Sequence, residues 1–291
     1  MSIPLEDAYG KTYLITGGAG SLGRRIAQYL LERIQPKAVR LFDNHENGLA
    51  RIRHLHPDVR LRYLVGDIRD RTRVLRAMEN VDICIHAAAL KHVDLCECNP
   101  FESVNTNVLG TQNCIEAALE CEIEKFLFLS SDKAVQAIST YGRCKALSES
   151  LTLDAENYKG DRRTAFAIAR PPNYIDSDGS IFDLWKYQKE HNLPITVTDE
   201  GMVRYFMKFD GILKFVVQCV NKMKGGEIFV PIGAEKHRIL DLARSVSSNI
   251  EIIGKRPGEK LLELLIDPEE MLRAEQQDGM WVIHSKVEKH G

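Results

Sequence analysis

The chain has 291 residues, of which 44% are hydrophobic and 27% are charged, and its formal net charge is -2. This composition is typical of a globular protein and excludes a disordered, collagen-like or coiled-coil chain. The near-neutral charge argues against a nucleic-acid partner, and no apolar run approaches the ~20 residues that a membrane helix needs. Residues 51–76 contain eight arginines, which we expect on a solvated face.

The first half of the chain predicts strands that alternate with helices. We expect strands at residues 11–16, 38–43, 61–65, 81–86, 125–130 and 164–169, and helices at 21–34, 100–121 and 139–158. This alternation predicts an α/β fold with a doubly wound, mostly parallel Rossmann sheet.

The second half of the chain lacks this regular alternation of strands and helices. After Arg170, prolines and glycines divide it into shorter pieces, which indicates a smaller C-terminal substrate-binding region at the carboxyl edge of the sheet. We therefore expect a dinucleotide-binding domain over residues 1–169 and a mainly substrate-binding region over 170–291. Elements at about 205–230 are expected to pack back on the first domain.

The cysteines and residues 1–7 bear on the compartment. The seven cysteines form no Cys-x-x-Cys pair, and residues 1–7 lack the basic and apolar segments of a signal peptide. We therefore expect reduced thiols and a cytoplasmic location. His92, Cys96 and Cys98 lack the paired spacing of a zinc site, so no metal is expected.

A glycine-rich turn joins the first predicted strand to the first predicted helix. Gly17, Gly20 and Gly23 have the spacing G-x-x-G-x-x-G. Glycines allow the backbone to approach a pyrophosphate closely, and free N–H groups at the helix start can bind it. The turn therefore predicts a dinucleotide cofactor, with Ser21 and Leu22 as further contacts; a turn without a ligand is the alternative.

Asp43 ends the second predicted strand, 20 residues after Gly23. A carboxylate there can accept hydrogen bonds from both ribose hydroxyls and would repel a 2′-phosphate, which favours NAD over NADP. NADP stays open as the alternative, because Arg24, Arg25 or Arg40 could pair with a phosphate. The other candidate cofactor contacts follow the ends of the second, third and fourth strands: Asn44, Asp67, Ile68, Ala87, Ala88 and Ala89.

Tyr141 and Lys145 have the spacing of two side chains on one helix face. A neighbouring ammonium and a positively charged nicotinamide would lower the pKa of the phenol, so Tyr141 could take a proton from a carbinol. The pair follows a strand that ends at Ser130 and Ser131. This arrangement indicates catalysis of hydride transfer, whereas a surface helix is the alternative.

These motifs resemble the extended short-chain dehydrogenase/reductase superfamily. Within it, three segments resemble inverting UDP-N-acetylglucosamine 4,6-dehydratases and related polysaccharide-biosynthesis dehydratases. The first segment covers residues 88–93, 99–102 and 106–111, the second covers 129–134, and the third covers 256–260.

The resemblance implies roles for Asp132 and Lys133 in a 4,6-dehydratase. Lys133 would remove the proton from C5 of the sugar, and Asp132 would protonate the C6 hydroxyl as it leaves, with Ser131 assisting Tyr141. The resemblance also implies tightly bound, recycled NAD, a UDP-hexosamine substrate and a homo-oligomer. A structural ion pair is the alternative for Asp132 and Lys133.

Arginine is the expected ligand of the substrate diphosphate, because a guanidinium offers a planar, bidentate fork. Arg204 and Arg256 are the main candidates, and Glu259 can accept from a ribose hydroxyl of the nucleotide. By resemblance, the further substrate-binding candidates are Lys91, Asn173, Gly179 and Ser180.

Two segments depart from the family pattern. Gln136-Ala137 stands where Asn-Pro is usual, and Pro171-Pro172 stands where Tyr-Gly is usual. Both segments border the sugar, so the substrate or the stereochemistry at C5 can differ. The alternatives to a dehydratase are a 4-epimerase or a 4-ketosugar reductase on the same scaffold and, more remotely, a non-catalytic NAD-binding sensor.

Overall fold

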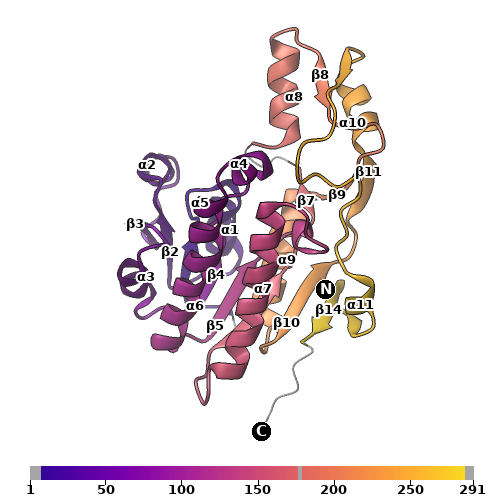
Figure 1. The fold of residues 1–291 in the computed structure, drawn as a ribbon. Coiled ribbons are helices and arrows are strands. Elements are labelled where there is room, and N and C mark those ends of the chain that lie inside the picture. The colour runs from indigo at the N-terminus through magenta and orange to yellow at the C-terminus, as the bar shows by residue number, and fades with distance from the viewer. Residues whose placement is uncertain (1–7, 176–178, 286–291) are drawn as a thin grey trace.

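The computed structural model describes residues 8–175 and 179–285, which form an α/β fold around a nine-stranded sheet (Figure 1). The strand order is β13-β14-β10-β6-β5-β4-β1-β2-β3. The strands from β3 to β10 in this order run parallel, whereas β14 and β13 are antiparallel additions. Our expectation for residues 1–7 lies outside the described residues.

The six strands predicted from the sequence are present, each within two residues of its expected limits. Their buried, apolar stretches explain why they form the centre of the sheet, and the prediction of a doubly wound parallel sheet is confirmed. The strand bounds are Thr12–Thr16 (β1), Ala38–Asp43 (β2), Leu61–Val65 (β3), Ile83–His86 (β4), Lys125–Leu129 (β5), Ala165–Ala169 (β6), Glu227–Pro231 (β10), Ala274–Gln277 (β13) and Met280–His284 (β14).

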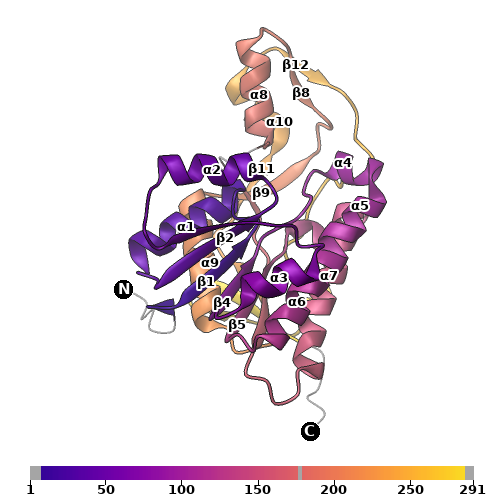
Figure 2. The same ribbon diagram turned by 90° about the vertical axis from the view of Figure 1, so that its left-hand side faces the viewer.

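Helices cover both faces of the sheet (Figure 2). One face carries α1 (Ser21–Arg33), α2 (Glu46–Leu55) and α9 (Phe209–Lys222), and the other carries α3 (Arg71–Met78), α6 (Gly110–Glu120) and α7 (Thr140–Tyr158). Successive residues of a strand point to opposite faces. Tyr13 and Ile15 of β1 therefore join one core, whereas Leu14 between them joins the other.

The helix predicted over residues 100–121 is interrupted by a wider turn. α5 (Pro100–Val104) and α6 flank a π-helical turn at Asn105–Leu109, and α4 (Val93–Cys98) precedes them. The carbonyl of Asn107 accepts hydrogen bonds from the hydroxyls of Thr111 and Ser148, both at 2.7 Å. The Asn107 side chain bonds the backbone N–H and carbonyl of Leu90, so this turn fixes the segment that follows β4.

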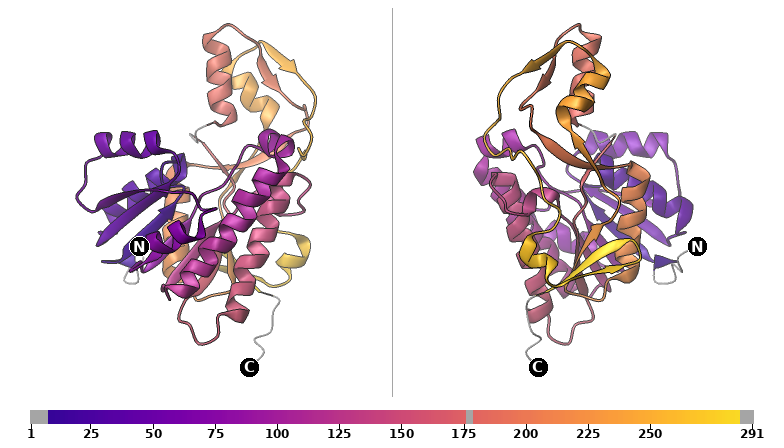
Figure 3. Two further views of the ribbon diagram at one scale, coloured as in Figure 1. Left: turned by 60° about the vertical axis from the view of Figure 1, so that its left-hand side comes forward. Right: turned by 90° about the vertical axis from the view of Figure 1, so that its right-hand side faces the viewer.

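A small lobe lies beyond the carboxyl edge of the large sheet (Figure 3). Its core contains Trp185, Val197, Phe206 and Ile239. The lobe and the segments that join it to the sheet comprise β7 (Asn173–Tyr174), α8 (Ile181–Glu190), β8 (Ile195–Val197), β9 (Val203–Met207), β11 (Glu235–Arg238), α10 (Ile239–Val246) and β12 (Ile250–Ile252).

The last part of the chain returns to the large sheet. α9 packs on a face of the sheet, and β10 joins the sheet beside β6. The β13–β14 hairpin, for which we predicted no strands, adds two antiparallel strands. A short helix, α11 (Pro268–Met271), precedes the hairpin. Among the described residues, no helix combines the length and apolarity needed to cross a membrane.

Candidate active site

A cavity of about 1000 Å³ is lined by the carboxyl ends of the parallel strands and by residues of the small lobe. All the candidate residues selected from the sequence, from Gly17 to Glu259, line this one cavity. Ligands bind at this edge in doubly wound folds, because the loops after successive strands converge there. The structure therefore brings the candidates together, whereas their individual roles remain proposals.

The glycines of the turn let its backbone pack closely against neighbouring backbone and lead into α1. Gly17 has a φ of 68°, and a Cβ there would lie 2.8 Å from the backbone nitrogen of Ala88. A Cβ on Gly23 would collide with the carbonyl oxygen of Gly17. α1 begins at Ser21 with Gly20 as its N-cap, no side chain caps its first N–H groups, and its first turn has no acidic residue. These features fit the diphosphate of a dinucleotide.

Asp43 is held beside this turn by two backbone donors. The N–H of Ala19 donates to Oδ2 and the N–H of His45 donates to Oδ1, each at 2.9 Å. Because a carboxylate oxygen has two lone pairs, both oxygens can still accept from ribose hydroxyls. The geometry thus fits the interpretation that favours NAD.

Two of the arginines that could have paired with a 2′-phosphate have other partners. Arg40 donates to the carbonyls of Ala77 and Glu79 at 2.8 and 2.6 Å. The guanidinium of Arg25 lies 4.2 Å from the ring centroid of Phe209. Both side chains are thus engaged within the protein, and the choice between NAD and NADP stays a proposal.

Asp67, one of the candidate cofactor contacts, is already engaged by donors of the protein. Arg69 forms an ion pair with it at 2.7 Å, and Asn44 donates to it at 3.2 Å. The hydrogen bonds from Arg69 are the main reason that the pKa of Asp67 is lowered to about 2. An adenine amino group would therefore have to share oxygens that are already engaged. Arg69 itself lines the cavity and is exposed, as we expected for the arginines of residues 51–76.

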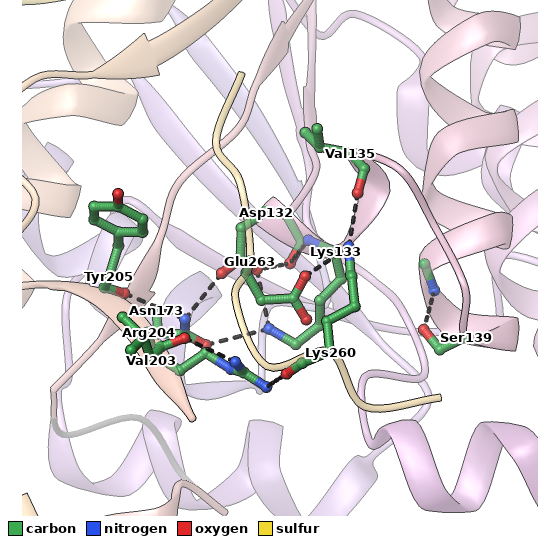
Figure 4. Close-up of polar contacts among 12 residues, drawn as sticks. Asp132, Lys133, Val135, Ser139, Asn173, Val203, Arg204, Tyr205, Lys260 and Glu263 are labelled. Atoms are coloured by element: carbon green, nitrogen blue, oxygen red, sulfur yellow. Dashed lines mark hydrogen bonds and ion pairs between the residues drawn. The ribbon is translucent and has the colours of Figure 1, made fainter. Parts of the chain in front are cut away.

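Asp132 and Lys133 form an ion pair at the end of β5 (Figure 4). They lie in a short 3-10 helix, Asp132–Ala134, which begins after Ser131. Nζ of Lys133 and Oγ of Ser131 each donate to Oδ1 of Asp132 at 2.9 Å. The Asp132 side chain is only 1% exposed, compared with 19% for Lys133. Both residues line the cavity, and the carboxylate is the more enclosed of the two.

Asn173 contacts both members of this pair, as Figure 4 shows. Its Nδ2 donates to Oδ2 of Asp132 at 2.9 Å and to the carbonyl of Tyr205 at 3.2 Å. Its Oδ1 accepts from Nζ of Lys133 at 3.3 Å. We selected Asn173 from the sequence as a substrate-binding residue, but the structure joins its side chain to the ion pair.

Tyr141 and Lys145 lie on α7, and burial shifts the pKa of each. Burial raises the pKa of Tyr141, and a hydrogen bond with Ser131 opposes this rise. Nζ of Lys145 donates to the carbonyl of Leu129 at 2.7 Å and lies 4.5 Å from the ring centroid of Phe128. Burial also lowers the pKa of Lys145 to about 8. Burial is thus the largest influence on the pKa of both groups, and the lowering that we expected from an ammonium together with a bound nicotinamide stays a prediction.

Arg204 holds a loop in addition to lining the cavity. Its guanidinium donates to the carbonyls of Val203, Lys260 and Leu261 at distances of 2.8, 2.9 and 3.1 Å. Three of its five N–H donors are thus used within the protein. Fewer donors therefore remain for a substrate diphosphate than a free guanidinium would offer. Oε2 of Glu259 accepts from the backbone N–H of Arg256 at 2.9 Å, and Arg256 itself is exposed.

The sequence did not identify Lys260 and Glu263 as site residues. Nζ of Lys260 donates to the carbonyl of Val135 and pairs with Oε2 of Glu263, each at 2.7 Å. Glu263 is 2% exposed and lines the cavity. Lys260 stands in the motif of residues 256–260 and could have been found there, whereas no sequence signal marks Glu263.

The described residues contain no group of three or more histidine, cysteine, aspartate or glutamate side chains that could hold a metal ion. This includes the neighbourhood of His92, Cys96 and Cys98. His92 instead packs against Gly179, where an added Cβ would lie 2.8 Å from the imidazole Cε1.

Comparison with known proteins places this site in a family. The family model described as "Polysaccharide biosynthesis protein" matches residues 13–285. The chain belongs to this family. It is 44% identical over 287 residues to an uncharacterized membrane protein of Methanocaldococcus jannaschii, a match that covers 94% of this chain and 86% of the relative.

Two further relatives of the chain have named activities. An inverting UDP-N-acetylglucosamine 4,6-dehydratase of Campylobacter jejuni is 38% identical over 266 residues, covering 90% of this chain and 79% of the relative. A UDP-glucose 4-epimerase of Rickettsia canadensis is 33% identical over 274 residues, covering 91% and 80%. The chain is thus related to both dehydratases and epimerases of nucleotide sugars.

Solved structures confirm the fold of this family member. Pen from Bacillus thuringiensis is 36% identical, with a TM-score of 0.93 and coverage of 98% of this chain and 92% of that one. DesIV, a dTDP-glucose 4,6-dehydratase from Streptomyces venezuelae solved with NAD and TYD bound, has a TM-score of 0.78 at 23% identity and covers 86% of each chain. The fold is that of the extended short-chain dehydrogenases/reductases.

Proposed function

We propose that the chain is a sugar-nucleotide 4,6-dehydratase, a carbon–oxygen lyase, that converts UDP-N-acetylglucosamine to a UDP-4-keto-6-deoxy-hexosamine. The observation that carries this proposal is the pairing of the enclosed Asp132 with Lys133 in the same cavity as Tyr141 and Lys145. The dehydratase relatives at 37–38% identity support it.

We assign the glycine turn and Asp43 to a tightly held NAD. The uncapped N–H groups of α1 would bind its diphosphate, and Asp43 would bind its adenosine ribose. When bound, NAD supplies the redox chemistry, since it takes a hydride at C4 of the sugar and gives it back at C6. Structural neighbours solved with NAD support this choice over NADP.

Tyr141 acts on the C4 hydroxyl in this proposal. As phenolate it takes the hydroxyl proton, and its hydrogen bond with Ser131 favours the charged form. Burial of Tyr141 opposes ionisation, so the phenolate requires positive charge in the site. The buried Lys145 supplies one such charge at neutral pH, because its pKa of about 8 keeps most of it protonated there.

Asp132 and Lys133 then carry out the elimination. A ketone at C4 makes the proton on C5 acidic, and the amine of Lys133 removes it. Asp132 donates a proton to the C6 oxygen, which leaves as water. These two roles require a neutral lysine and a protonated aspartate, which is the ion pair with one proton moved between partners that lie 2.9 Å apart.

A 4-epimerase is the second candidate function. The relatives named UDP-glucose 4-epimerases favour it, since they match at 33–34% identity. Epimerisation needs Tyr141 and an assisting hydroxyl but no acid–base pair for C5 and C6. The presence of Asp132 and Lys133 in the cavity therefore favours the dehydratase.

The product separates these functions. Purified protein is incubated with UDP-N-acetylglucosamine in deuterated water, and the product is analysed by mass spectrometry and NMR. Loss of one water with deuterium at C5 is the expected result, and the NMR couplings report retention or inversion at C5. An isomer of unchanged mass would instead support the epimerase. A cytoplasmic location and a homo-oligomeric assembly remain predictions from the sequence.

A further inference from the structure

The Asn173 side chain links the two residues assigned to the elimination. Asn173 begins β7 directly after Pro171 and Pro172, whose rings restrict the backbone. Its amide nitrogen donates to Asp132 and to the Tyr205 carbonyl, and its amide oxygen accepts from Lys133. These three contacts span β5, β7 and β9, so they tie the pair to the edge of the small lobe.

The chemistry of these partners permits one orientation of the amide. Two acceptors, a carboxylate and a backbone carbonyl, face Nδ2, whereas a donor faces Oδ1. Flipping the amide would place an oxygen against two oxygens and leave the N–H groups facing an ammonium. Oδ2 of Asp132 therefore accepts from Asn173, whereas Oδ1 accepts from Ser131 and Lys133.

We propose that Asn173 is a positioning residue that holds the acid proton of Asp132 on Oδ1, next to Lys133. This inference rests on the proposed dehydratase function. Oδ2 accepts from Asn173, whereas the proton to be moved lies between Nζ of Lys133 and Oδ1. Oδ1 faces Nζ of Lys133 at 2.9 Å and is the oxygen that receives the proton.

The resulting proton transfer balances. One N–H bond of the Lys133 ammonium breaks and one O–H bond forms on Oδ1 of Asp132, with no change in net charge. The products are a neutral amine and a carboxylic acid, which the removal of the C5 proton and the departure of the C6 hydroxyl require. When both steps are complete, Lys133 carries the C5 proton and Asp132 is again a carboxylate, so the ion pair is restored.

The Oδ1 atom of Asn173 adds a second effect on Lys133. It accepts one N–H of the lysine at 3.3 Å, and this contact persists when the lysine is neutral, because an amine keeps two N–H groups. The other N–H group and the lone pair of the neutral amine can then face Asp132 and the cavity. Asn173 thereby orients both the acid and the base.

A substrate-binding role for Asn173 predicts different kinetics. Loss of a contact that binds substrate and transition state equally raises KM and leaves kcat unchanged, whereas loss of a positioning contact lowers kcat. The two variants to be measured are Asn173→Asp, which removes the donor with little change in shape, and Asn173→Ser, which keeps one donor. Asn157→Asp is the control, since Asn157 is exposed near the far end of α7 and its side chain donates to Asp154.

We expect kcat for water loss from UDP-N-acetylglucosamine to fall about 100-fold in Asn173→Asp, in the range of general acid–base effects, while KM changes less than about threefold. The fall in kcat is expected to be smaller in Asn173→Ser, because serine keeps one donor. The pH profile of kcat should shift in Asn173→Asp, because a second carboxylate then competes with Asp132 for the proton. Formation of reduced cofactor on mixing with substrate, followed by absorbance, should persist in both variants and shows that they are folded.

The outcomes separate this inference from the proposed function. A wild-type protein that dehydrates, together with an Asn173→Asp variant that changes only KM and keeps its pH profile, overturns the inference alone. A wild-type protein that releases no water from UDP-hexosamines overturns the proposed function and the inference with it. An equal loss of kcat in Asn157→Asp would show that the effect of an added carboxylate is not specific to Asn173.

Discussion

The hydroxyl of Thr16 lies 2.6 Å from Nδ1 of His86 and so joins the end of β1 to the end of β4 inside the fold. Nε2 of His86 lies 3.0 Å from Oγ1 of Thr111 on α6. The Thr16 hydroxyl also accepts from the backbone N–H groups of Ala87 and Ala88, both at 3.2 Å. The two sides of the proposed cofactor site are therefore fixed by one buried network centred on His86.

This network predicts a loss of stability in acid. Burial, aided by the charge of Lys145, lowers the pKa of His86 from 6.5 to about 3. Between these values the unfolded chain binds a proton that the folded protein does not, so stability falls as the pH drops below the unfolded value. By about pH 5 the loss from this group is about 2 kcal/mol.

Urea unfolding at neutral pH and at about pH 5 measures this effect. His86→Gln lacks the titrating ring, so its free energy of unfolding should decrease by about 2 kcal/mol less than that of the wild type over this range. At neutral pH the variant is expected to be the less stable protein, because the glutamine cannot reproduce both threonine contacts. Equal pH-dependent losses in the two proteins would contradict the assignment of the acid sensitivity to His86.

The glycine turn gives a second prediction, which concerns cofactor affinity. Gly17 and Gly160 have φ angles of 68° and 60°, so alanine is strained at both. At Gly17 a Cβ would lie 2.8 Å from the backbone of Ala88, whereas at Gly160 nothing lies within 4 Å. Gly17→Ala should therefore weaken NAD binding by at least about tenfold, while Gly160→Ala leaves it unchanged. Titration calorimetry checks this, and equal affinities in the two variants would exclude crowding at Gly17 as the cause.

The large sheet could be predicted because its strands carry a strong local signal. In β1, Tyr13, Leu14 and Ile15 form a short apolar run that is buried on both faces and ends at the glycine turn. The small lobe gave no comparable signal, since β8 and β12 contain only three residues each. The π-helical turn was also missed, because hydroxyls distant in sequence, such as that of Ser148, satisfy the carbonyl of Asn107.

The residues of the site were easier to predict than their contacts. Tyr141, Asp132 and Arg204 were selected from motifs, and the structure places them in one cavity. Arg204 nevertheless bonds carbonyls 56 and 57 positions away, and Lys260 bonds a carbonyl 125 positions away. Such pairings depend on how the lobe packs on the sheet, which no local pattern specifies. The catalytic roles of these residues remain predictions.

The proposed role of Lys133 predicts that its removal abolishes dehydration without loss of cofactor binding. Lys133→Ala removes the proposed C5 base and leaves the cofactor turn untouched, so dehydration should be abolished while NAD stays bound. The matched control is Lys222→Ala, which breaks an exposed ion pair with Asp278 and should keep wild-type activity. Product mass and cofactor content are measured for both. Wild-type rates of water loss in Lys133→Ala would refute its role as the base.

The contacts of Arg204 predict that it acts on the substrate partly through a loop. Lysine at this position keeps a positive charge but lacks the planar fork that reaches Val203, Lys260 and Leu261 together. Arg204→Lys should therefore release the segment that carries Arg256 and Glu259, lower the free energy of unfolding by about 1–3 kcal/mol and raise KM.

Limited proteolysis and steady-state kinetics test this effect of Arg204→Lys. Cleavage within residues 255–262 should become faster, and KM for the nucleotide sugar should rise about tenfold while kcat falls less, since the loop binds substrate in the ground state and the transition state alike. Arg238→Lys is the control, because Arg238 is exposed on the neighbouring strand β11 and donates through Nε to the carbonyl of Glu200. If KM rises in Arg204→Lys without faster cleavage, Arg204 acts on the diphosphate directly and the loop is not its means of action.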